Sequence, residues 1–297
     1  MNRKDFGLLL AALRQDLGWT QFHLAEVSEL DISIISQIER GVKKFFEPEI
    51  LFKLADALQL TTLERREFIF AASGLDESQL VRQPTPGVST AAHDPKRILD
   101  RLIFVTQELM LPAYLYDVYG DIVAVNNIIL SLYQIPQFVF ENASNVPAGY
   151  NVTRLNFSRD MVGRFQVAEN WEQYGINAMR TFRECSFRYR ATPYFKYLMN
   201  VFRNQTEYPV FERFWKLVSS REDDKQANVD HFSYLHKELG YLKYVASSSI
   251  TYTSFGEIFL IYYLPIDEHT YQVFDQLKSK AGKGVTRLAP WPEKPMP

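Results

Sequence analysis

The stretch from Thr20 to Gly41, TQFHLAEVSELDISIISQIERG, constrains the chain most, because it predicts two short helices joined by a tight turn. Thr20 is typical of a helix N-cap, since its hydroxyl can accept a hydrogen bond from a free amide of the first turn. Asp31 predicts a second N-cap, and Gly41 predicts a C-cap with a left-handed backbone. Small or apolar residues fall on the inner faces of both helices: Leu24, Ala25, Leu30, Ile35 and Ile38. The pattern predicts a helix-turn-helix whose second helix enters the major groove of DNA.

Three further helices surround this pair in the sequence. Apolar residues recur at helical spacing from Asp5 to Leu17 and again from Pro48 to Leu60. Thr61 with Glu64 forms a capping box, which predicts a fifth helix that ends near Gly74. Residues 1–75 are therefore expected to form an all-α domain of five helices.

Parts of this domain resemble the phage-repressor and XRE class of helix-turn-helix domains, which are lambda-repressor-like. The matching pieces are Thr20-Gln21, Leu24-Ala25, Ile35 to Glu39, and Gly41. The resemblance implies that Ile32, Ser33 and Gln37 face base edges. One departure is Glu29, which occupies the turn position that glycine usually holds, so a left-handed backbone there costs free energy.

The second predicted helix presents Ser36 outward as well. Gln37 can pair with adenine through two hydrogen bonds, and Ile32 can contact a thymine methyl group. Gln21, at the start of a helix, is expected to hold a phosphate. The cluster of Arg40, Lys43 and Lys44 is expected to do the same, or to be a solvated basic loop. Glu39 is expected to pair with a nearby cation. The expected partner is double-stranded DNA, bound by a homodimer; the alternative is a helical hairpin used only for protein contact.

Charge alone does not indicate nucleic-acid binding. The chain has a formal net charge of −2, and residues 1–80 contain nine Lys or Arg against thirteen Asp or Glu. Any affinity for DNA must therefore come from cations at particular positions rather than from a basic domain.

Residues 76–95, rich in proline and small polar residues, predict a linker. A second domain is expected over 96–285, beginning with a helix over 96–110. A hairpin is predicted over 112–127 and three strands over 232–264, with helices between and after them. This order predicts a five-stranded antiparallel sheet with helices on one face, in a PAS-like arrangement. The tail, 286–297, is expected to be disordered. The fold class is thus α+β with two domains.

Several segments of the second domain resemble the ligand-binding domain of MmyB-like regulators: PAYLYDVYGDIVAVNN, YNVTRLNFS, NWEQYGINAMRTFR and YPVFERFW. That family joins an XRE-type helix-turn-helix to a PAS-like domain, so the resemblance covers nearly the whole chain. It implies a transcription regulator that responds to a small molecule.

Candidate ligand-binding residues combine polar groups with aromatic rings. The polar candidates are Asn126, Asn151, Arg154 and Arg183, and the rings that could wall an apolar pocket are Tyr114, Phe165, Trp171 and Tyr174. A medium- or long-chain fatty acid would suit such a pocket, since each buried CH₂ contributes about 0.8 kcal/mol. The alternative is a filled aromatic core with surface salt bridges, in a domain that only dimerises or binds another protein. Coupling is expected to pass through the helix over 96–110 and the linker.

Signals for catalysis are missing from the sequence. The five histidines lack metal-ligand spacing, and neither a phosphate-binding glycine loop nor a nucleophile elbow occurs. We therefore expect a protein that is not an enzyme and has neither cofactor nor metal. The single cysteine, Cys185, rules out an internal disulfide and fits the cytoplasm. No apolar run approaches the roughly 20 residues that span a bilayer, so we expect no membrane association.

Overall fold

The computed structural model describes residues 1–74, 94–134, 143–159, 171–218 and 232–295. The chain divides into two compact units. Unit 1 contains residues 1–88, 183–197 and 215–226, and unit 2 contains residues 89–182, 198–214 and 227–297. The first division falls inside the expected linker, of which only Asp94 and Pro95 are described. Unit 1 also takes two segments from the second half of the chain, which the sequence did not predict.

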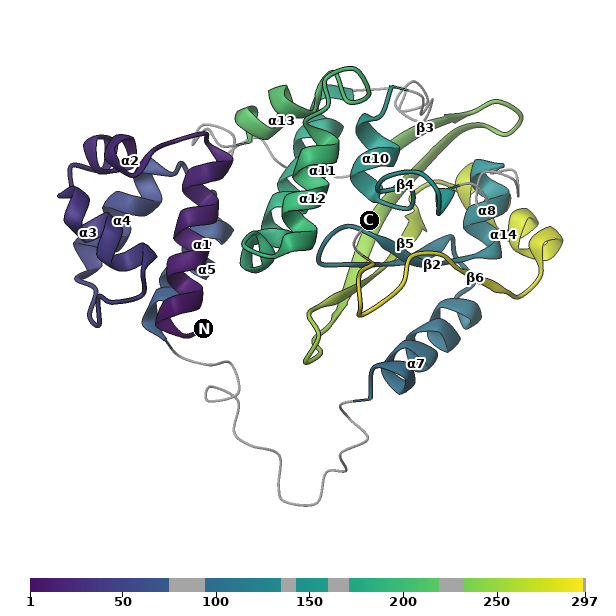
Figure 1. Ribbon diagram of the computed structural model, residues 1–297. Coiled ribbons are helices and arrows are strands. Elements are labelled where there is room, and N and C mark those ends of the chain that lie inside the picture. Colours follow the sequence, from purple (N-terminus) through teal and green to yellow (C-terminus); the bar gives the residue numbers. More distant parts are fainter. Residues whose placement is uncertain (75–93, 135–142, 160–170, 219–231, 296–297) are drawn as a thin grey trace. The chain divides into compact units, whose positions relative to one another are not determined.

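The first 74 residues of unit 1 form five helices (Figure 1). These are α1 Arg3–Asp16, α2 Gln21–Ser28, α3 Ile32–Glu39, α4 Pro48–Ala57 and α5 Thr62–Ser73. The predicted caps are confirmed, because the side chain of Thr20 accepts from the amide of His23 and that of Asp31 from the amide of Ser33. The capping box of Thr61 and Glu64 is also present, and Gly74 ends α5 in the left-handed conformation.

A single hydrophobic core joins these helices. Leu24, Ile35 and Ile38 are fully buried in it, as predicted, and Leu30 packs against it while partly exposed. Phe187, from the second half of the chain, is fully buried in the same core. The core of the five helices therefore includes a side chain from outside residues 1–75.

The turn between α2 and α3 carries the strain that the sequence indicates. Glu29 has φ 51° and ψ 41°, which is the left-handed region that glycine adopts most easily. Its amide donates to the carbonyl of Glu26, as a helix C-cap requires. The chain thus keeps the expected turn geometry without the usual glycine.

Unit 2 is built on an antiparallel sheet of six strands in the order β3-β4-β5-β1-β2-β6. The strands are β1 Ala113–Asp117, β2 Ile122–Asn126, β3 Phe232–His236, β4 Gly240–Thr251, β5 Ile258–Pro265 and β6 Val285–Arg287. The first five were predicted, but β6 was not, so the expected count of five strands is wrong. Only three residues long and without clear alternation, β6 lacks the period of two that reveals a strand. The PAS-like arrangement stays a prediction.

The tail is ordered, contrary to expectation, as far as residue 295. β6 pairs with β2, and the amides of Leu288 and Ala289 donate to the carbonyls of Val123 and Ile122. Further along, the ammonium group of Lys294 is buried in an ion pair. Prolines in this segment favoured disorder in the sequence, whereas long-range pairing with β2 fixes it in the structure.

Helices contact both faces of the sheet rather than one. The helices that follow α5 in the described residues are α7 Pro95–Glu108, α8 Asn127–Tyr133, α10 Val152–Phe157, α11 Trp171–Ser186, α12 Pro193–Phe202, α13 Phe211–Leu217 and α14 Glu268–Ala281, with a 3₁₀ turn at Phe187–Tyr189. Leu102 of α7 packs on the face formed by Leu115 and Leu260. On the opposite face, Tyr244 of β4 contacts Phe274 of α14. Among the described helices, none combines the length and apolar character needed to cross a bilayer.

Candidate DNA-binding surface and ligand-binding domain

The surface of α3 presents the side chains that were predicted to read bases. Ser33 and Gln37 are exposed, Ser36 is half-buried, and Ile32 is 45% exposed although it is apolar. The apolar side chain of Ile32 thus stands open to water at the start of α3. The four residues therefore share one accessible surface of unit 1.

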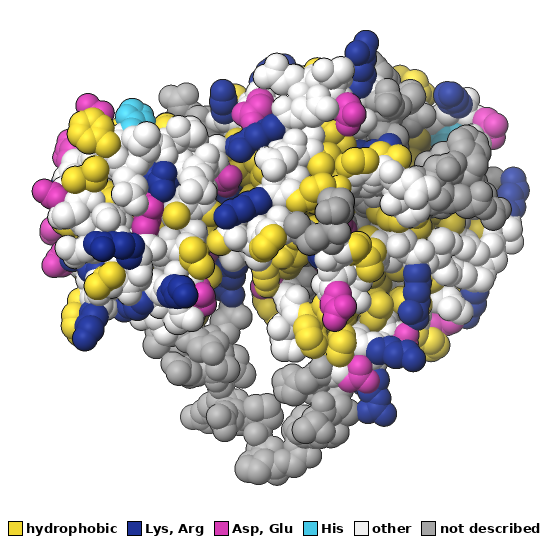
Figure 2. Space-filling model, viewed as in Figure 1, with side chains coloured by type: hydrophobic (Ala, Val, Ile, Leu, Met, Phe, Trp, Pro, Cys, Tyr) yellow, Lys and Arg dark blue, Asp and Glu magenta, His cyan; other side chains and the backbone are white. Residues whose placement is uncertain are grey.

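The predicted phosphate-binding residues flank this surface. Arg40 and Lys44 are exposed and Lys43 is half-buried in the loop after α3. The Nε of Arg40 donates to the carbonyl of Ser36 at 3.2 Å. Figure 2 shows basic and acidic side chains mixed over the visible face of α1–α5, in keeping with the negative net charge of residues 1–80.

Glu39 has the structural role that was predicted for it. Its carboxylate accepts from Nε and Nη2 of Arg14 at 2.6 and 2.9 Å, and from Nε2 of Gln21 at 2.7 Å. Arg14 also donates to the carbonyl of Trp19. This network holds α1, α2 and α3 together and orients the side chain of Gln21. The sequence gave no signal for Arg14, because its partner lies 25 positions away.

The aromatic candidates of unit 2 belong to a larger set of tyrosines. The hydroxyl of Tyr133 lies 3.0 Å from that of Tyr263 and 3.4 Å from that of Tyr244, and the ring of Tyr114 meets that of Tyr263 edge to face, with the centroids 6.2 Å apart. Burial raises the pKa of each of these phenols. They are therefore neutral hydrogen-bonding groups in an apolar interior.

Two of the other predicted rings form one end of α11. Trp171 stacks on Tyr174 with their centroids 5.7 Å apart, and the hydroxyl of Tyr174 donates to Asn156 at 2.9 Å. Burial raises the pKa of Tyr174 to about 12. Phe165 lies outside the described residues. The structure thus brings Trp171 and Tyr174 together.

The predicted polar ligand-binding residues in unit 2 form hydrogen bonds within the protein itself. Asn126 accepts from the amides of Ala113 and Ile129 and donates to the carbonyl of Leu111. Asn151 caps α10 and donates to the carbonyl of Tyr119 and to Asp121. Arg154 donates to the carbonyl of Gly149 at 3.1 Å. Asn126 and Asn151 are fully buried and Arg154 is half-buried, so the two asparagines hold the fold around the site.

Asn151 lies beside a charged cluster that the sequence did not reveal. The ammonium group of Lys294 pairs with Asp117 and, at 2.8 Å, with Asp121, and all three side chains are almost fully buried. Burial and the neighbouring Asp121 outweigh the charge of Lys294, and the pKa of Asp117 rises to about 6. These three residues, the Asp117 cluster, tie the tail to the β1–β2 hairpin.

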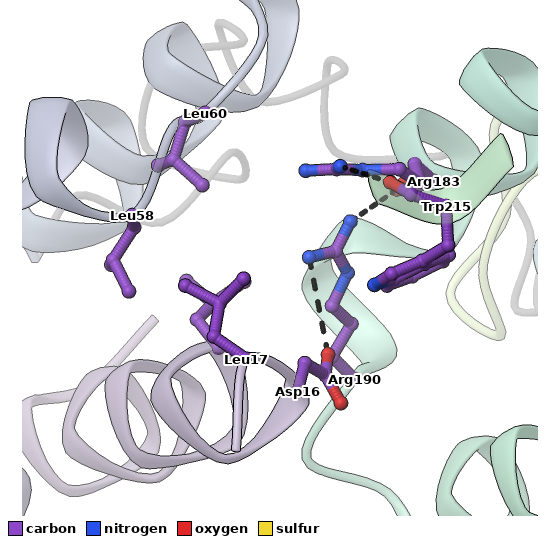
Figure 3. Close-up of a pocket in the computed structure, with 8 residues that line it drawn as sticks. Asp16, Leu17, Leu58, Leu60, Arg183, Arg190 and Trp215 are labelled. Carbon is purple, nitrogen blue, oxygen red and sulfur yellow. Dashed lines mark hydrogen bonds and ion pairs between the residues drawn. The ribbon is translucent and has the colours of Figure 1, made fainter. Parts of the chain in front are cut away.

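Arg183 does not belong with the other predicted ligand-binding residues. It lies in unit 1, where its guanidinium group donates to both oxygens of Glu64 at 3.0 and 2.8 Å. Figure 3 shows it with Arg190 and Trp215, facing Leu58 and Leu60 across a small hollow. The cavity there measures about 10 Å³, which is close to the space of one water molecule and too small for an organic ligand.

Comparison with known families agrees with this architecture. Residues 102–277 match the model of the MmyB-like transcription regulator ligand binding domain, and residues 5–68 match a helix-turn-helix domain. The chain belongs to the MmyB-like transcription regulators. A search among curated proteins found no significant match.

The range matched by the ligand-binding family in this MmyB-like regulator does not coincide with unit 2. The ligand-binding match begins at Leu102 and runs through residues 183–197, which the structure places in unit 1. Part of the family's ligand-binding domain is therefore built into the same compact unit as the helix-turn-helix.

Proposed function

We propose that the protein is a ligand-responsive transcription regulator that binds duplex DNA as a homodimer through α3. The observation that carries the proposal is the helix-turn-helix in which Ser33 and Gln37 stand exposed on one surface, flanked by Arg40 and Lys44. Half-sites would lie about one helical turn apart, roughly 34 Å. Gln37 would read adenine, and Arg40 would hold a phosphate.

A band shift on the DNA upstream of the protein's own gene tests the DNA-binding role. Gln37→Ala removes a base contact and is expected to cost about 1–3 kcal/mol of binding free energy on the preferred sequence. Arg40→Ala is expected to weaken binding to all sequences and to reduce the salt slope by about one. Unchanged binding by both variants would contradict the assignment. Glu26→Gln, an exposed change on α2, serves as the matched control.

For the ligand, we propose a small amphiphile bound in unit 2, with a medium- or long-chain fatty acid as the first candidate. The support is the membership in a family with a ligand-binding domain, together with the neutral tyrosine hydroxyls inside an aromatic interior. Arg154 would receive the carboxylate. The bound chain would contribute about 0.8 kcal/mol for each buried CH₂.

Mass spectrometry of lipid extracted from the purified full-length protein tests this ligand class. Titrations with palmitate and with cetyl alcohol then separate a charged head from a neutral one. Palmitate should bind more tightly, and Arg154→Gln should remove that preference. Stronger binding of the alcohol would indicate that the tyrosine hydroxyls, rather than Arg154, receive the head group.

A second function is favoured by one specific observation. Asn126 and Asn151 are already hydrogen-bonded to the fold, and the phenols of Tyr133, Tyr244 and Tyr263 are bonded to one another. Such a domain can serve purely for dimerisation or for binding another protein. Protein that extracts without lipid and binds neither probe would support this alternative, and the DNA-binding role would remain.

A further inference from the structure

Glu64 is the centre of a buried set of charges in unit 1. Its side chain is completely shielded from water, and its carboxylate accepts from the amide of Thr61 at 3.0 Å as well as from two arginines. Arg183 reaches it with Nε and Nη2 in the two-pronged geometry that arginine forms best with carboxylates. Arg190 adds a third charged contact through Nη2. We name Glu64, Arg183 and Arg190 the Glu64 cluster.

Trp215 and the backbone complete the surroundings of this cluster. The ring of Trp215 lies 5.1 Å from the guanidinium carbon of Arg183 and 5.2 Å from that of Arg190. Arg183 donates to the carbonyl of Trp215, and Arg190 donates to the carbonyl of Arg183 (Figure 3). Asp16 of α1 lies 4.0 Å from Arg190 and brings a second carboxylate. One carboxylate and two guanidinium groups are therefore buried together, with the partly exposed Asp16 at the edge of the cluster.

Such a cluster makes the position of α5 depend on residues 183–190. A buried carboxylate is tolerated only while its cationic partners stay in place. Two neighbouring contacts follow the same segment, since Glu184 accepts from the hydroxyl of Thr61 and Arg188 pairs with Glu67. Together with Phe187 in the core, they make this segment the partner surface for the start of α5.

Arg183, one of the two arginines of the Glu64 cluster, lies in the last turn of α11. α11 runs without interruption for 16 residues, from Trp171 to Ser186, a length of about 24 Å. Its first two turns, in unit 2, carry Trp171 and Tyr174, which are two of the predicted ligand-binding residues. A helix moves largely as one body, so a shift of its first turns is felt at Arg183.

We propose that α11 transmits the state of the ligand-binding domain to the helix-turn-helix, with the Glu64 cluster as its point of attachment. This inference rests on the proposed function, since it supplies its route of regulation. A ligand beside Trp171 and Tyr174 displaces the start of α11, the two-pronged contact between Arg183 and Glu64 changes, and α5 shifts within the core that it shares with α3. The route differs from the one expected through α7 and the linker.

Gly175 offers a way to move α11 without any ligand. A Cβ at this position would lie 2.7 Å from the ring of Phe214, so the helix or the ring must shift. Gly175→Ala is otherwise favourable to a helix. Thr181→Ala, an exposed change on the same helix, is the matched control.

The experiment uses the full-length protein and two measurements: affinity for the DNA upstream of its own gene, and hydrogen exchange of the α5 amides. Gly175→Ala is expected to change the DNA affinity about fivefold or more and to change exchange in α5, whereas Thr181→Ala changes neither. Both effects should disappear when Arg183 is also replaced by Lys, which keeps the charge and loses the two-pronged contact. Arg203→Lys, in the half-exposed pair with Glu212, should leave them intact.

Palmitate gives a second, independent arm. If it binds, its effect on DNA affinity should be lost in Arg183→Lys while its own affinity stays within about twofold, since this arginine lies outside unit 2. Failure of palmitate to bind would overturn only the ligand class. A Gly175→Ala variant with unchanged DNA affinity and unchanged exchange in α5 would overturn the proposed route, and it would leave DNA binding untouched.

Discussion

Units 1 and 2 each bury a group of charged side chains. Cations are in excess in the first group and carboxylates in the second. In the Glu64 cluster, one carboxylate faces two arginines; in the Asp117 cluster, two carboxylates face one lysine. Burial would raise the pKa of Glu64, but the charges of Arg190 and Arg183 outweigh it and lower the pKa to about 2. For Asp117, burial and Asp121 prevail, and the pKa rises to about 6.

The difference shows that the surplus charge in a buried cluster, rather than burial itself, decides whether a carboxylate stays ionised. Both side chains are shielded from water to a similar degree. The Glu64 cluster is stable as an ion pair at neutral pH, whereas the Asp117 cluster holds one negative charge more than Lys294 can balance.

The largest effect is expected when the cluster in unit 1 loses its only central anion. Glu64→Gln leaves Arg183 and Arg190 buried without their shared carboxylate, which should cost on the order of 3–5 kcal/mol of unfolding free energy. Urea unfolding at neutral pH measures this loss. Glu172→Gln breaks the exposed pair with Arg213 and should change stability by less than about 1 kcal/mol. Equal losses in the two variants would show that the buried cluster contributes nothing special.

The second prediction concerns pH, where the two clusters should act with opposite sign. The folded pKa of Asp117 is raised, so its contribution to stability is full below about 3.8 and is lost as the pH rises through about 6. The folded pKa of Glu64 is lowered, so its contribution is full above about 4.5 and is lost as the pH falls toward 2. Each contribution is on the order of 3 kcal/mol.

Unfolding free energies measured across this range should therefore pass through a maximum between the two titrations. Asp117→Asn has no titrating group at this position and should flatten the pH dependence only between about pH 4 and 6. A flattened acid side in the same variant would mean that the two clusters are not independent.

Removing the cation of the Asp117 cluster should have a smaller effect than removing Glu64. Lys294→Met leaves two buried carboxylates, one of which can relieve the repulsion by taking a proton, so we expect a loss of about 2–3 kcal/mol at neutral pH. The loss should shrink at pH 5, where Asp117 is already protonated. Lys283→Met, in the exposed pair with Glu108, is the control. Thermal unfolding at both pH values tests this, and a loss that grows on acidification would refute it.

The smallest effect is expected at a partly exposed ion pair next to the Glu64 cluster. Arg188 donates to Glu67 at 2.7 Å, and both side chains are about one quarter exposed. Water screens this pair, so Arg188→Gln should cost no more than about 1 kcal/mol. Urea unfolding beside Glu64→Gln would then separate the contribution of burial from that of the charge. A loss as large as that of Glu64→Gln would indicate a structural role for the whole segment instead.

The parts of this fold that sequence predicts are those whose signals are local. The caps at Thr20 and Asp31 and the box of Thr61 and Glu64 act over two or three residues, and the strands are revealed by alternation. β6 has neither signal. The Glu64 cluster joins residues 119 positions apart, which no spacing rule detects.

The candidate site shows the same limit. Arg183 was predicted to bind a ligand because it stands among aromatic residues, and the structure gives it aromatic surroundings, but those of Trp215 in unit 1. Asn126 and Asn151 were chosen as polar groups near rings, and both prove to be helix caps. The local sequence can mark a polar residue among aromatic ones as a candidate for burial, whereas only the fold shows which groups it binds.

Glu64 caps α5 in the helix-turn-helix domain, while its charge is neutralised by Arg183 and Arg190, more than 100 positions later in the chain. A chimaera that joins the first 75 residues to a foreign domain therefore lacks both arginines that pair with Glu64. Suppressors of a defect at position 64 should then map to codons 183 or 190, well outside the region that a geneticist would sequence first.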